Sequence, residues 1–188
     1  MVLKESDIEE LSRGESVPDF TLEGTDGDIY ELDDFDEYDA VLVVFTCNHC
    51  PYAKAKFEEL NYLTDNYNDL AVVGINPNDS EEYPDDSLEN MRNLVDDGTV
   101  NYTEYLRDET QEVAREYGAV CTPDPYLLEN TPDGFVLRYH GRIDDVLDAE
   151  SDREPERYYM REAVEAVLEG DDVEFDDLPS RGCSIKWK

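Results

Sequence analysis

Residues 40–52 read AVLVVFTCNHCPY, and this stretch decides the fold because it joins a buried strand to a helix through two cysteines. Residues 40–45 are apolar throughout and rich in valine, which predicts a central strand covered on both faces. Apolar residues then recur at helical spacing, at Ala53, Phe57, Leu60, Leu63 and Tyr67. A second apolar run follows at residues 70–75, so the segment predicts a β-α-β unit with a right-handed crossover.

The elements on either side of this unit complete one α/β domain. Asp26-Gly27 lies between two short alternating segments, which predicts a β-hairpin near the N-terminus. Residues 88–95 predict a helix inserted after the second apolar strand. The turn residues Pro132-Asp133-Gly134 join two further strands, and Gly170 ends a last helix.

We therefore expect a single domain over residues 1–188, with a central mixed sheet flanked by helices. Its expected parts are an N-terminal extension with the hairpin at 1–39, a core at 40–168 with an insertion at about 77–107, and a C-terminal tail at 169–188. At this length one domain is the default and can bury a substantial core.

The charge balance indicates the surroundings of the protein. The chain has 50 acidic and 15 basic residues, a formal net charge of −35, which would repel a phosphate backbone or an anionic membrane surface. Molar salt would relieve the self-repulsion, because it shortens the Debye length to about 3 Å. Only five of the fifteen cations are Lys, as is typical of a halophile's acidic surface. An acidic face for a cationic partner is the alternative interpretation.

The apolar pattern indicates the compartment. Residues 1–10 contain acids in place of an apolar stretch, so we expect no signal peptide. The longest apolar run, residues 40–45, is far too short to span a bilayer. We therefore expect a cytoplasmic protein with neither nucleic acid nor a membrane among its partners.

The pair Cys47 and Cys50 carries the chemistry that we expect. A thiol between a strand and a helix meets the unpaired N–H groups of the helix, which favour the thiolate. The two intervening residues would let Cys50 resolve a mixed disulfide formed by Cys47. His49 would tune the site, since an imidazolium beside Cys47 stabilises its thiolate and raises the reduction potential. No cofactor is expected beyond a redox-active Cys47–Cys50 disulfide.

Two other interpretations of the cysteines remain open. Zinc would need further ligands, for which Cys121, Cys183, His49 and His140 are available. A structural zinc site usually contains a second closely spaced ligand pair, and the sequence has none, so we expect no metal. The third interpretation is that the cysteines carry no chemistry.

The order of elements, the C-x-x-C pair and the later Thr122-Pro123 resemble the thioredoxin superfamily. More narrowly, four motifs resemble the thioredoxin-fold group called peroxiredoxin-like, which is classed with the AhpC/TSA redoxins. The motifs are FTCNHCPY (45–52), CTPDPYL (121–127), HGRIDD (140–145) and GCSIKW (182–187). They extend over essentially the whole chain. The resemblance implies a thioredoxin-like fold and a redox activity, but names no substrate.

The resemblance also implies a substrate groove at Thr122 and Pro123, because thioredoxin-fold proteins place a cis-proline against the dithiol. The sequence departs from the thioredoxin pattern and from the peroxiredoxin pattern, and both departures limit what the resemblance implies. Thr46 stands where thioredoxin has a Trp, and the buried acid of the thioredoxin strand is missing, so the proton acceptor for Cys50 is unassigned. The peroxiredoxin pattern Pro-x-x-x-Thr-x-x-Cys is absent as well, which weakens a peroxidase assignment.

Two polar residues near the last hairpin are candidates for accessory roles. Arg142 could orient a substrate near the dithiol, although an ion pair with Asp144 or Asp145 that fixes the loop is the interpretation we favour. His140 lies at a strand end, where a structural hydrogen bond is more typical than a role as base.

Cys121 and Cys183 are candidates for a second redox pair. In a thioredoxin fold the loop entering the cis-proline approaches the C-x-x-C, and Cys121 stands two residues before Pro123. The tail is long enough to reach this loop, and Ile185 and Trp187 could anchor it. Two isolated buried cysteines are the alternative.

We therefore expect a thiol-disulfide oxidoreductase in which Cys47 attacks and Cys50 resolves. Its partners would be a disulfide or thiol client and an electron-donor redoxin. A peroxidase acting on small hydroperoxides is the alternative enzyme, and a metal-binding or interaction module is the alternative without catalysis. The sequence leaves the oligomeric state open.

Overall fold

The computed structural model describes residues 2–188, which form ten strands, five α-helices and two 3-10 helices. The strands are β1 (Leu3–Glu5), β2 (Thr21–Gly24), β3 (Ile29–Glu31), β4 (Ala40–Phe45), β5 (Leu70–Asn76), β6 (Glu104–Arg107), β7 (Cys121–Thr122), β8 (Asp124–Thr131), β9 (Gly134–His140) and β10 (Arg181–Ser184). The helices are η1 (Leu32–Phe35), α1 (Pro51–Lys54), α2 (Phe57–Asn66), η2 (Pro84–Asp86), α3 (Leu88–Asp96), α4 (Glu112–Glu116) and α5 (Tyr159–Glu169).

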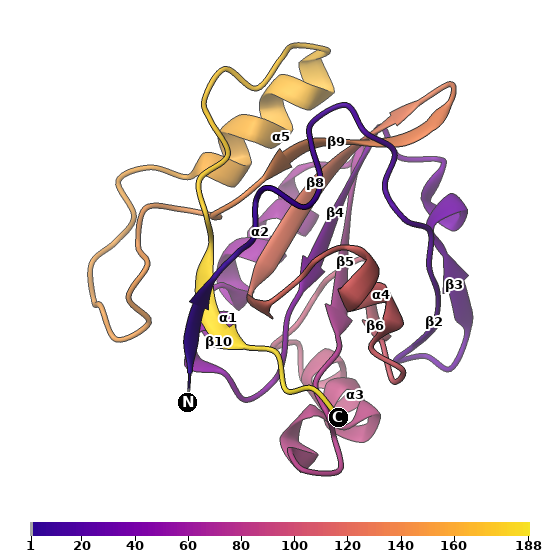
Figure 1. Ribbon diagram of the computed structural model, residues 1–188, viewed down its shortest axis with the longest axis vertical. Helices are drawn as coiled ribbons and strands as arrows, with labels where there is room; N and C mark the ends of the chain where they lie inside the picture. Colours follow the sequence, from indigo (N-terminus) through magenta and orange to yellow (C-terminus); the bar gives the residue numbers. More distant parts are fainter. Residues whose placement is uncertain (1) are drawn as a thin grey trace.

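Strand β4 lies in the interior of a seven-stranded mixed sheet with the order β3-β2-β6-β5-β4-β8-β9 (Figure 1). It pairs in parallel with β5 and antiparallel with β8, while β5 pairs in parallel with β6. Every residue of β4 and β5 is buried, as their apolar sequences predict. The mixed α/β fold expected from the sequence is confirmed.

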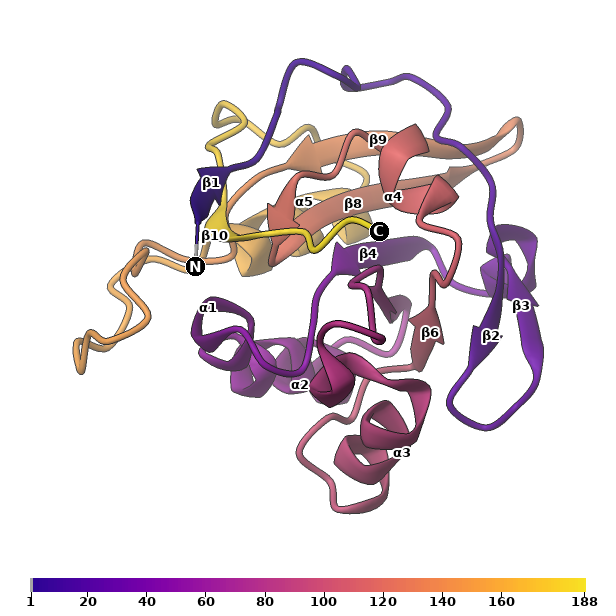
Figure 2. The same ribbon diagram turned by 60° about the horizontal axis from the view of Figure 1, so that its bottom comes forward.

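Helices cover both faces of this sheet, so the side chains of β4 alternate between two separate cores. On one face Val41 and Phe45 pack in a cluster with Ala114 of α4. On the other face Leu42 and Val44 pack with α2 and α5. Figure 2 shows α4 above β4 and α2 below it. The polar ends of these buried strands are therefore where the chain can present functional side chains.

The helix after the cysteine pair is broken in two, where the apolar spacing predicts one continuous helix. α1 begins at Pro51 and ends at Lys54, and α2 begins only at Phe57. Lys56 lies at the break, and its ammonium group contacts both carboxylate oxygens of Asp144 at 2.7 Å. The apolar positions are nevertheless buried as expected, because α2 continues along the same face of the sheet.

The predicted insertion at about 77–107 is longer than the segment that lies outside the main sheet. Its first part forms η2 and α3, but its last four residues form β6, which pairs with both β5 and β2. The N-terminal hairpin of β2 and β3 joins the sheet through this strand. Residues 104–107 are thus part of the core sheet.

The C-terminal tail is held by a second, three-stranded sheet with the order β1-β10-β7. β10 pairs antiparallel with β1 on one side and with β7 on the other. Figures 1 and 2 both show the N-terminal strand β1 and the C-terminal strand β10 side by side, close to α1. Residues far apart in the sequence therefore meet beside the cysteine pair.

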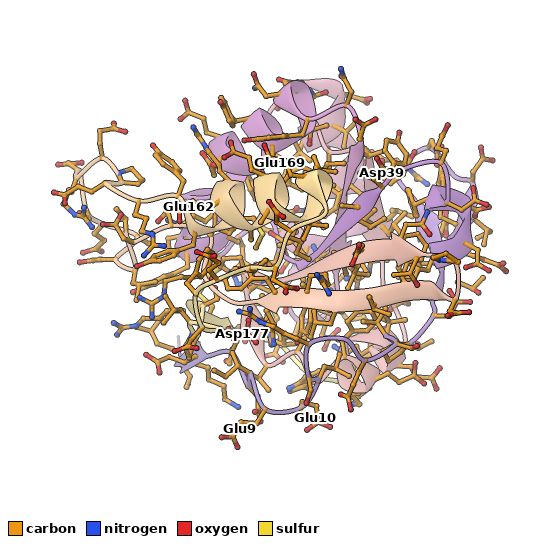
Figure 3. The ribbon with its side chains drawn as sticks, turned by 90° about the horizontal axis from the view of Figure 1, so that it is seen from above. Glu9, Glu10, Asp39, Glu162, Glu169 and Asp177 are labelled. Atoms are coloured by element: carbon orange, nitrogen blue, oxygen red, sulfur yellow. A yellow bond between two sulfur atoms is a disulfide. The ribbon has the colours of Figure 1, made fainter. Side chains whose placement is uncertain are left out.

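Acidic side chains project from the exterior of the fold (Figure 3). Exposed examples come from the N-terminal segment, the residue before β4, and α5, namely Glu9, Glu10, Asp39, Glu162 and Glu169. Within residues 2–188, no helix combines the length and the apolar composition needed to cross a membrane.

Candidate active site

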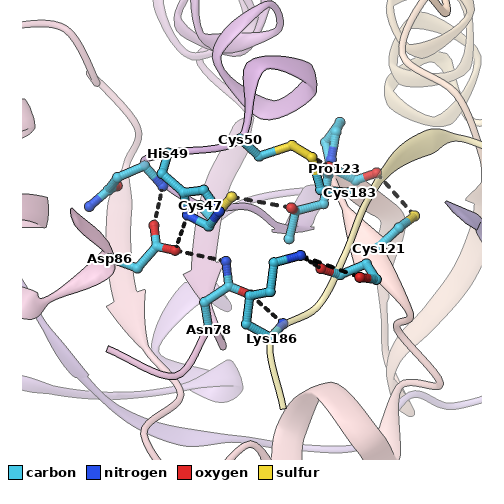
Figure 4. Close-up of a disulfide and its surroundings, with 12 residues drawn as sticks. Cys47, His49, Cys50, Asn78, Asp86, Cys121, Pro123, Cys183 and Lys186 are labelled. Atoms are coloured by element: carbon cyan, nitrogen blue, oxygen red, sulfur yellow. Dashed lines mark hydrogen bonds and ion pairs between the residues drawn. A yellow bond between two sulfur atoms is a disulfide. The ribbon is translucent and has the colours of Figure 1, made fainter. Parts of the chain in front are cut away.

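Cys47 and Cys50 lie at the junction of β4 and α1, where the sequence places them. Cys47 follows β4 by two residues, and Cys50 directly precedes α1; both side chains are fully buried. The backbone of His49 and Cys50 acts to lower the pKa of the Cys47 thiol. Thr122 Oγ1 lies 3.2 Å from the Cys47 sulfur atom (Figure 4).

The disulfide in the structure joins Cys50 to Cys183, whose Cα atoms are 6.3 Å apart. Within residues 2–188 the free cysteines are Cys47 and Cys121, and both are buried. The structure therefore holds a different disulfide from the expected Cys47–Cys50 bond. The predicted pairing of Cys121 with Cys183 is wrong.

The register of β10 explains this correction. Cys183 lies opposite Thr122, while Ser184 lies opposite Cys121. Opposite residues of antiparallel strands share a face, and successive residues alternate between faces. Cys183 therefore points to the side where Cys50 lies, and Cys121 points away from it. The Cys121 sulfur instead lies 3.7 Å from the Pro123 carbonyl oxygen (Figure 4).

The Thr122–Pro123 peptide bond is cis, as the resemblance implies. Thr122 and Pro123 are buried because the tail covers them. Ser180, just before β10, donates a hydrogen bond of 2.8 Å to the Pro123 carbonyl. The predicted substrate groove is thus filled by the chain's own tail in this structure.

Burial raises the pKa of the Cys47 thiol to about 12, and the negative charge of Asp86 adds to the effect. The hydrogen bonds from Thr122 and from the backbone of Cys50 and His49 act in the opposite direction but are outweighed. The expectation of a stabilised thiolate is therefore wrong for this state of the protein. With the tail docked, Cys47 is a protonated thiol at neutral pH.

Asp86 is the main site residue that the sequence analysis missed. Its buried carboxylate accepts hydrogen bonds from the Asn48 backbone at 2.6 Å and from Asn78 Nδ2 at 2.8 Å, and contacts His49 Nδ1 at 2.5 Å (Figure 4). Burial acts to raise the pKa of Asp86, but the bonds with His49 and Asn78 outweigh it and hold the pKa below its usual value. The one signal in the sequence was the polar Asn76-Pro77-Asn78 at the end of an apolar strand.

His49 therefore sits in a pair with Asp86 and does not face Cys47 as a lone cation. Its ring also stacks on Tyr83, with ring centroids 5.3 Å apart. When His49 is protonated, the neighbouring carboxylate offsets its charge. The tuning of Cys47 by His49 stays a prediction, and Asp86 would take part in it through its contact with His49.

One group of side chains in the described part of the chain has the donor atoms for a metal ion. The ligand atoms of Cys47, His49 and Asp86 lie within 4.8 Å of one another. This donor set suits zinc with an open fourth position. Hydrogen bonds from Asn48 and Asn78 already occupy the Asp86 oxygens, so metal binding would have to displace them.

A pocket of about 500 Å³ is lined by residues of α1 and α2 and of the loop between β9 and α5, together with Pro123 and the start of β10. Pro123, Arg142 and Arg181 are among its lining residues. The ion pair that we favoured for Arg142 is wrong, because Asp144 binds Lys56 and Asp145 binds Arg153. Arg142 is thus available to a ligand in the pocket.

The two other candidate residues from the sequence, His140 and Thr46, are buried and hydrogen-bonded within the fold. His140 is fully buried, and its Nε2 lies 2.7 Å from Asp124 Oδ1 while its ring stacks on Tyr126. Thr46 is also fully buried, and its backbone N–H donates to Ile75 at 2.8 Å. Neither is brought to an accessible part of the site.

The fold, the cysteine pair at a strand–helix junction and the adjacent cis-proline define a redoxin-type protein with a thioredoxin-like fold. More specifically, the chain belongs to the AhpC/TSA family, whose model matches residues 13–146. A search of curated proteins finds no match.

Two solved structures are similar over the whole chain. An uncharacterized conserved protein from Geobacillus kaustophilus is 38% identical, with a TM-score of 0.91, over 100% of this chain and 97% of its own. A hypothetical protein from Sinorhizobium meliloti is 35% identical, with a TM-score of 0.89, over 98% of each chain. The thioredoxin domain of a thiol-disulfide oxidoreductase from Bacteroides vulgatus shares the fold at 20% identity, with a TM-score of 0.55 over 70% of this chain and 91% of its own.

Proposed function

We propose that the protein is a thiol-disulfide oxidoreductase of the AhpC/TSA family, with Cys47 as nucleophile and Cys50 as resolving cysteine. The observation that carries the proposal is the redox state of the pair. Cys50 takes part in a disulfide, while Cys47, three residues away, is a free thiol beside the cis-proline loop. Cys50 is thus in a disulfide within the fold, and Cys47 is the free thiol of the pair.

The proposed reaction starts from the fully reduced protein. The Cys47 thiolate attacks a client disulfide, so that one client sulfur leaves as a thiolate and the other stays bound to Cys47. Cys50, after losing its proton, attacks the Cys47 sulfur, releases the second client thiolate and closes the Cys47–Cys50 disulfide. The two client thiolates take up protons, and an electron-donor redoxin with a dithiol returns the protein to its reduced form.

Reduction is also what would open the site. In the oxidised structure the Cys50–Cys183 bond ties β10 to the start of α1, and Cys47 is fully buried beneath it. Breaking that bond leaves the tail held only by noncovalent contacts. Its release from β7 would expose Thr122, whose backbone could then pair with an extended client segment.

The pocket beside Pro123 is the proposed entrance for a client. Arg142 and Arg181 line it, and neither is in an ion pair among the described residues. The same pocket is also lined by acids that have no ion pair among the described residues, namely Glu58, Asp148, Asp152 and Glu154. Against this acidic lining, we propose that the two free guanidinium groups bind a client carboxylate near its disulfide. We also propose that the protein works in the cytoplasm of a halophile, which its acidic composition supports.

A peroxidase acting on small hydroperoxides is the second candidate, and family membership favours it. Against it stands the absence of a Thr three residues before Cys47, where the peroxiredoxin pattern requires one.

Reduction of insulin disulfides with dithiothreitol as electron donor tests the proposal. Wild-type protein and Cys121→Ser should be active, whereas Cys47→Ser and Cys50→Ser should lose turnover. Consumption of hydrogen peroxide with the same donor separates the second candidate. Activity that survives in Cys47→Ser would refute the proposed function, and rapid peroxide turnover without insulin reduction would favour the peroxidase.

A further inference from the structure

Three cysteines converge on one residue, Thr122. The Cys47 sulfur lies 3.2 Å from Thr122 Oγ1, and the Cys50 sulfur lies 3.6 Å from the Thr122 carbonyl oxygen. Cys183 is paired opposite Thr122 in the β7–β10 ladder and is bonded to Cys50. All three side chains also belong to the same buried cluster. Cys50 is therefore placed between two alternative disulfide partners.

The tail is built to keep Cys183 at this position. At Gly182 the backbone runs so close to the cis-proline loop that an added Cβ would lie 1.9 Å from the Thr122 carbonyl oxygen. Beyond Cys183, the buried Ile185 packs into the core, and the Lys186 backbone donates to Asn78 Oδ1 at 2.8 Å. These contacts hold Cys183 near Cys50 without any covalent bond, which gives its thiol a high effective concentration.

We propose that Cys183 is a third redox cysteine, which takes the disulfide over from Cys47–Cys50 and returns Cys47 to the thiol form. This relay rests on the proposed function, because the Cys47–Cys50 bond is the product of client reduction. The Cys183 thiol loses a proton and attacks the Cys50 sulfur. The Cys47–Cys50 bond breaks, the Cys50–Cys183 bond forms, and Cys47 leaves as a thiolate that takes up one proton. The step is an isomerisation and needs no oxidant or reductant.

The site favours the product of this exchange. The contacts of the tail hold Cys183 beside Cys50 at a high effective concentration. The Cys47 side chain is fully enclosed in the same apolar cluster, so it is shielded from other disulfides while the tail is docked. The relay would therefore store the oxidised state in the tail and keep the nucleophile reduced until the donor acts.

The experiment adds one equivalent of 5,5′-dithiobis(2-nitrobenzoate) to fully reduced protein, with acid quenching and peptide mapping of the disulfides over time. Wild-type protein should release two thionitrobenzoate ions, pass through Cys47–Cys50 and end as Cys50–Cys183, with the final bond favoured by about tenfold or more. Cys183→Ser and Cys183→Ala should also release two ions but stop at Cys47–Cys50. Cys121→Ser is the matched control and should behave as the wild type.

Each contrary result has its own meaning. Wild-type protein that ends as Cys47–Cys50, with Cys183 open to alkylation, would overturn the relay and leave the proposed function intact. Direct formation of Cys50–Cys183 with no earlier Cys47–Cys50 would also overturn the relay and make the tail bond purely structural. Release of only one ion by both Cys183 variants would overturn the proposed function instead, because Cys50 would then fail to resolve.

Discussion

Replacing Asp86 by Asn should make Cys47 more reactive, because the Asp86 carboxylate opposes the thiolate. The substitution keeps the shape of the side chain and removes one buried negative charge. The Asp86 oxygen and the Cys47 sulfur are no more than 4.8 Å apart. Asp86 is fully buried and therefore weakly screened by solvent.

The geometry sets the size of the effect. Two unit charges 4.8 Å apart repel by about 3 kcal/mol at an effective dielectric constant of about 20, which corresponds to roughly a hundredfold in the thiolate fraction. His49 beside Asp86 offsets part of this repulsion when it is protonated. We therefore expect the thiolate fraction of Cys47 to rise by roughly three- to thirtyfold in Asp86→Asn.

The assay is the rate of iodoacetamide alkylation of Cys47 in the reduced protein as a function of pH, followed by peptide mass. The rate increases with pH because only the thiolate reacts, and in Asp86→Asn this increase should begin at lower pH. Asp85→Asn is the matched control, since it removes the same charge from the neighbouring exposed residue. The control should leave the profile close to that of the wild type.

An unchanged or slower alkylation rate in Asp86→Asn would refute this reasoning. So would equal acceleration in Asp85→Asn, because the effect would then come from the overall negative charge of the protein. In either case the His49–Asp86 pair would have no specific influence on the nucleophile.

Three further outcomes are expected. The midpoint of thermal unfolding should fall when sodium chloride is diluted from about 2 M to about 0.1 M, because the Debye length grows to about 10 Å and the acidic residues repel one another; an unchanged midpoint would argue for an acidic partner-binding face. Arg142→Gln should raise KM for glutathione disulfide about tenfold, because this substrate offers a carboxylate to the guanidinium group. KM for the uncharged hydroxyethyl disulfide should not change. Equal effects on both substrates would show that Arg142 is not part of the client site. Gly182→Ala should destabilise the oxidised protein by about 1–3 kcal/mol, measured by urea unfolding, because the added methyl meets the Thr122 carbonyl; a neutral effect would mean that the tail docks more loosely.

The core of the fold could be predicted because its signals are local. The apolar run of β4 and the turn residues of the β8–β9 hairpin each determine their own element. The cis bond at Pro123 followed from the resemblance. The break before α2 was missed because the apolar spacing continues across it, from Ala53 to Phe57.

The parts of the site that were missed depend on tertiary register. Nothing in the tail sequence tells which of two neighbouring residues, Cys121 or Thr122, will face Cys183, and a shift of one residue reverses the answer. Asp86 is one of 50 acidic residues, and its burial beside Cys47 and His49 is a tertiary feature that the sequence does not display. The pKa of Cys47 is raised first by burial and then by this buried charge, so the sequence alone suggested the wrong direction for it.

The most direct test of the central claim is to locate the covalent client adduct. The double variant Cys50→Ser, Cys183→Ser lacks both sulfur atoms that could resolve a mixed disulfide at Cys47. After reaction with hydroxyethyl disulfide, peptide mass mapping should find the adduct on Cys47, whereas the matched variant Cys47→Ser, Cys183→Ser should accumulate none at a comparable rate. An adduct on Cys121, or equal rates in the two variants, would contradict the assignment of Cys47 as the nucleophile.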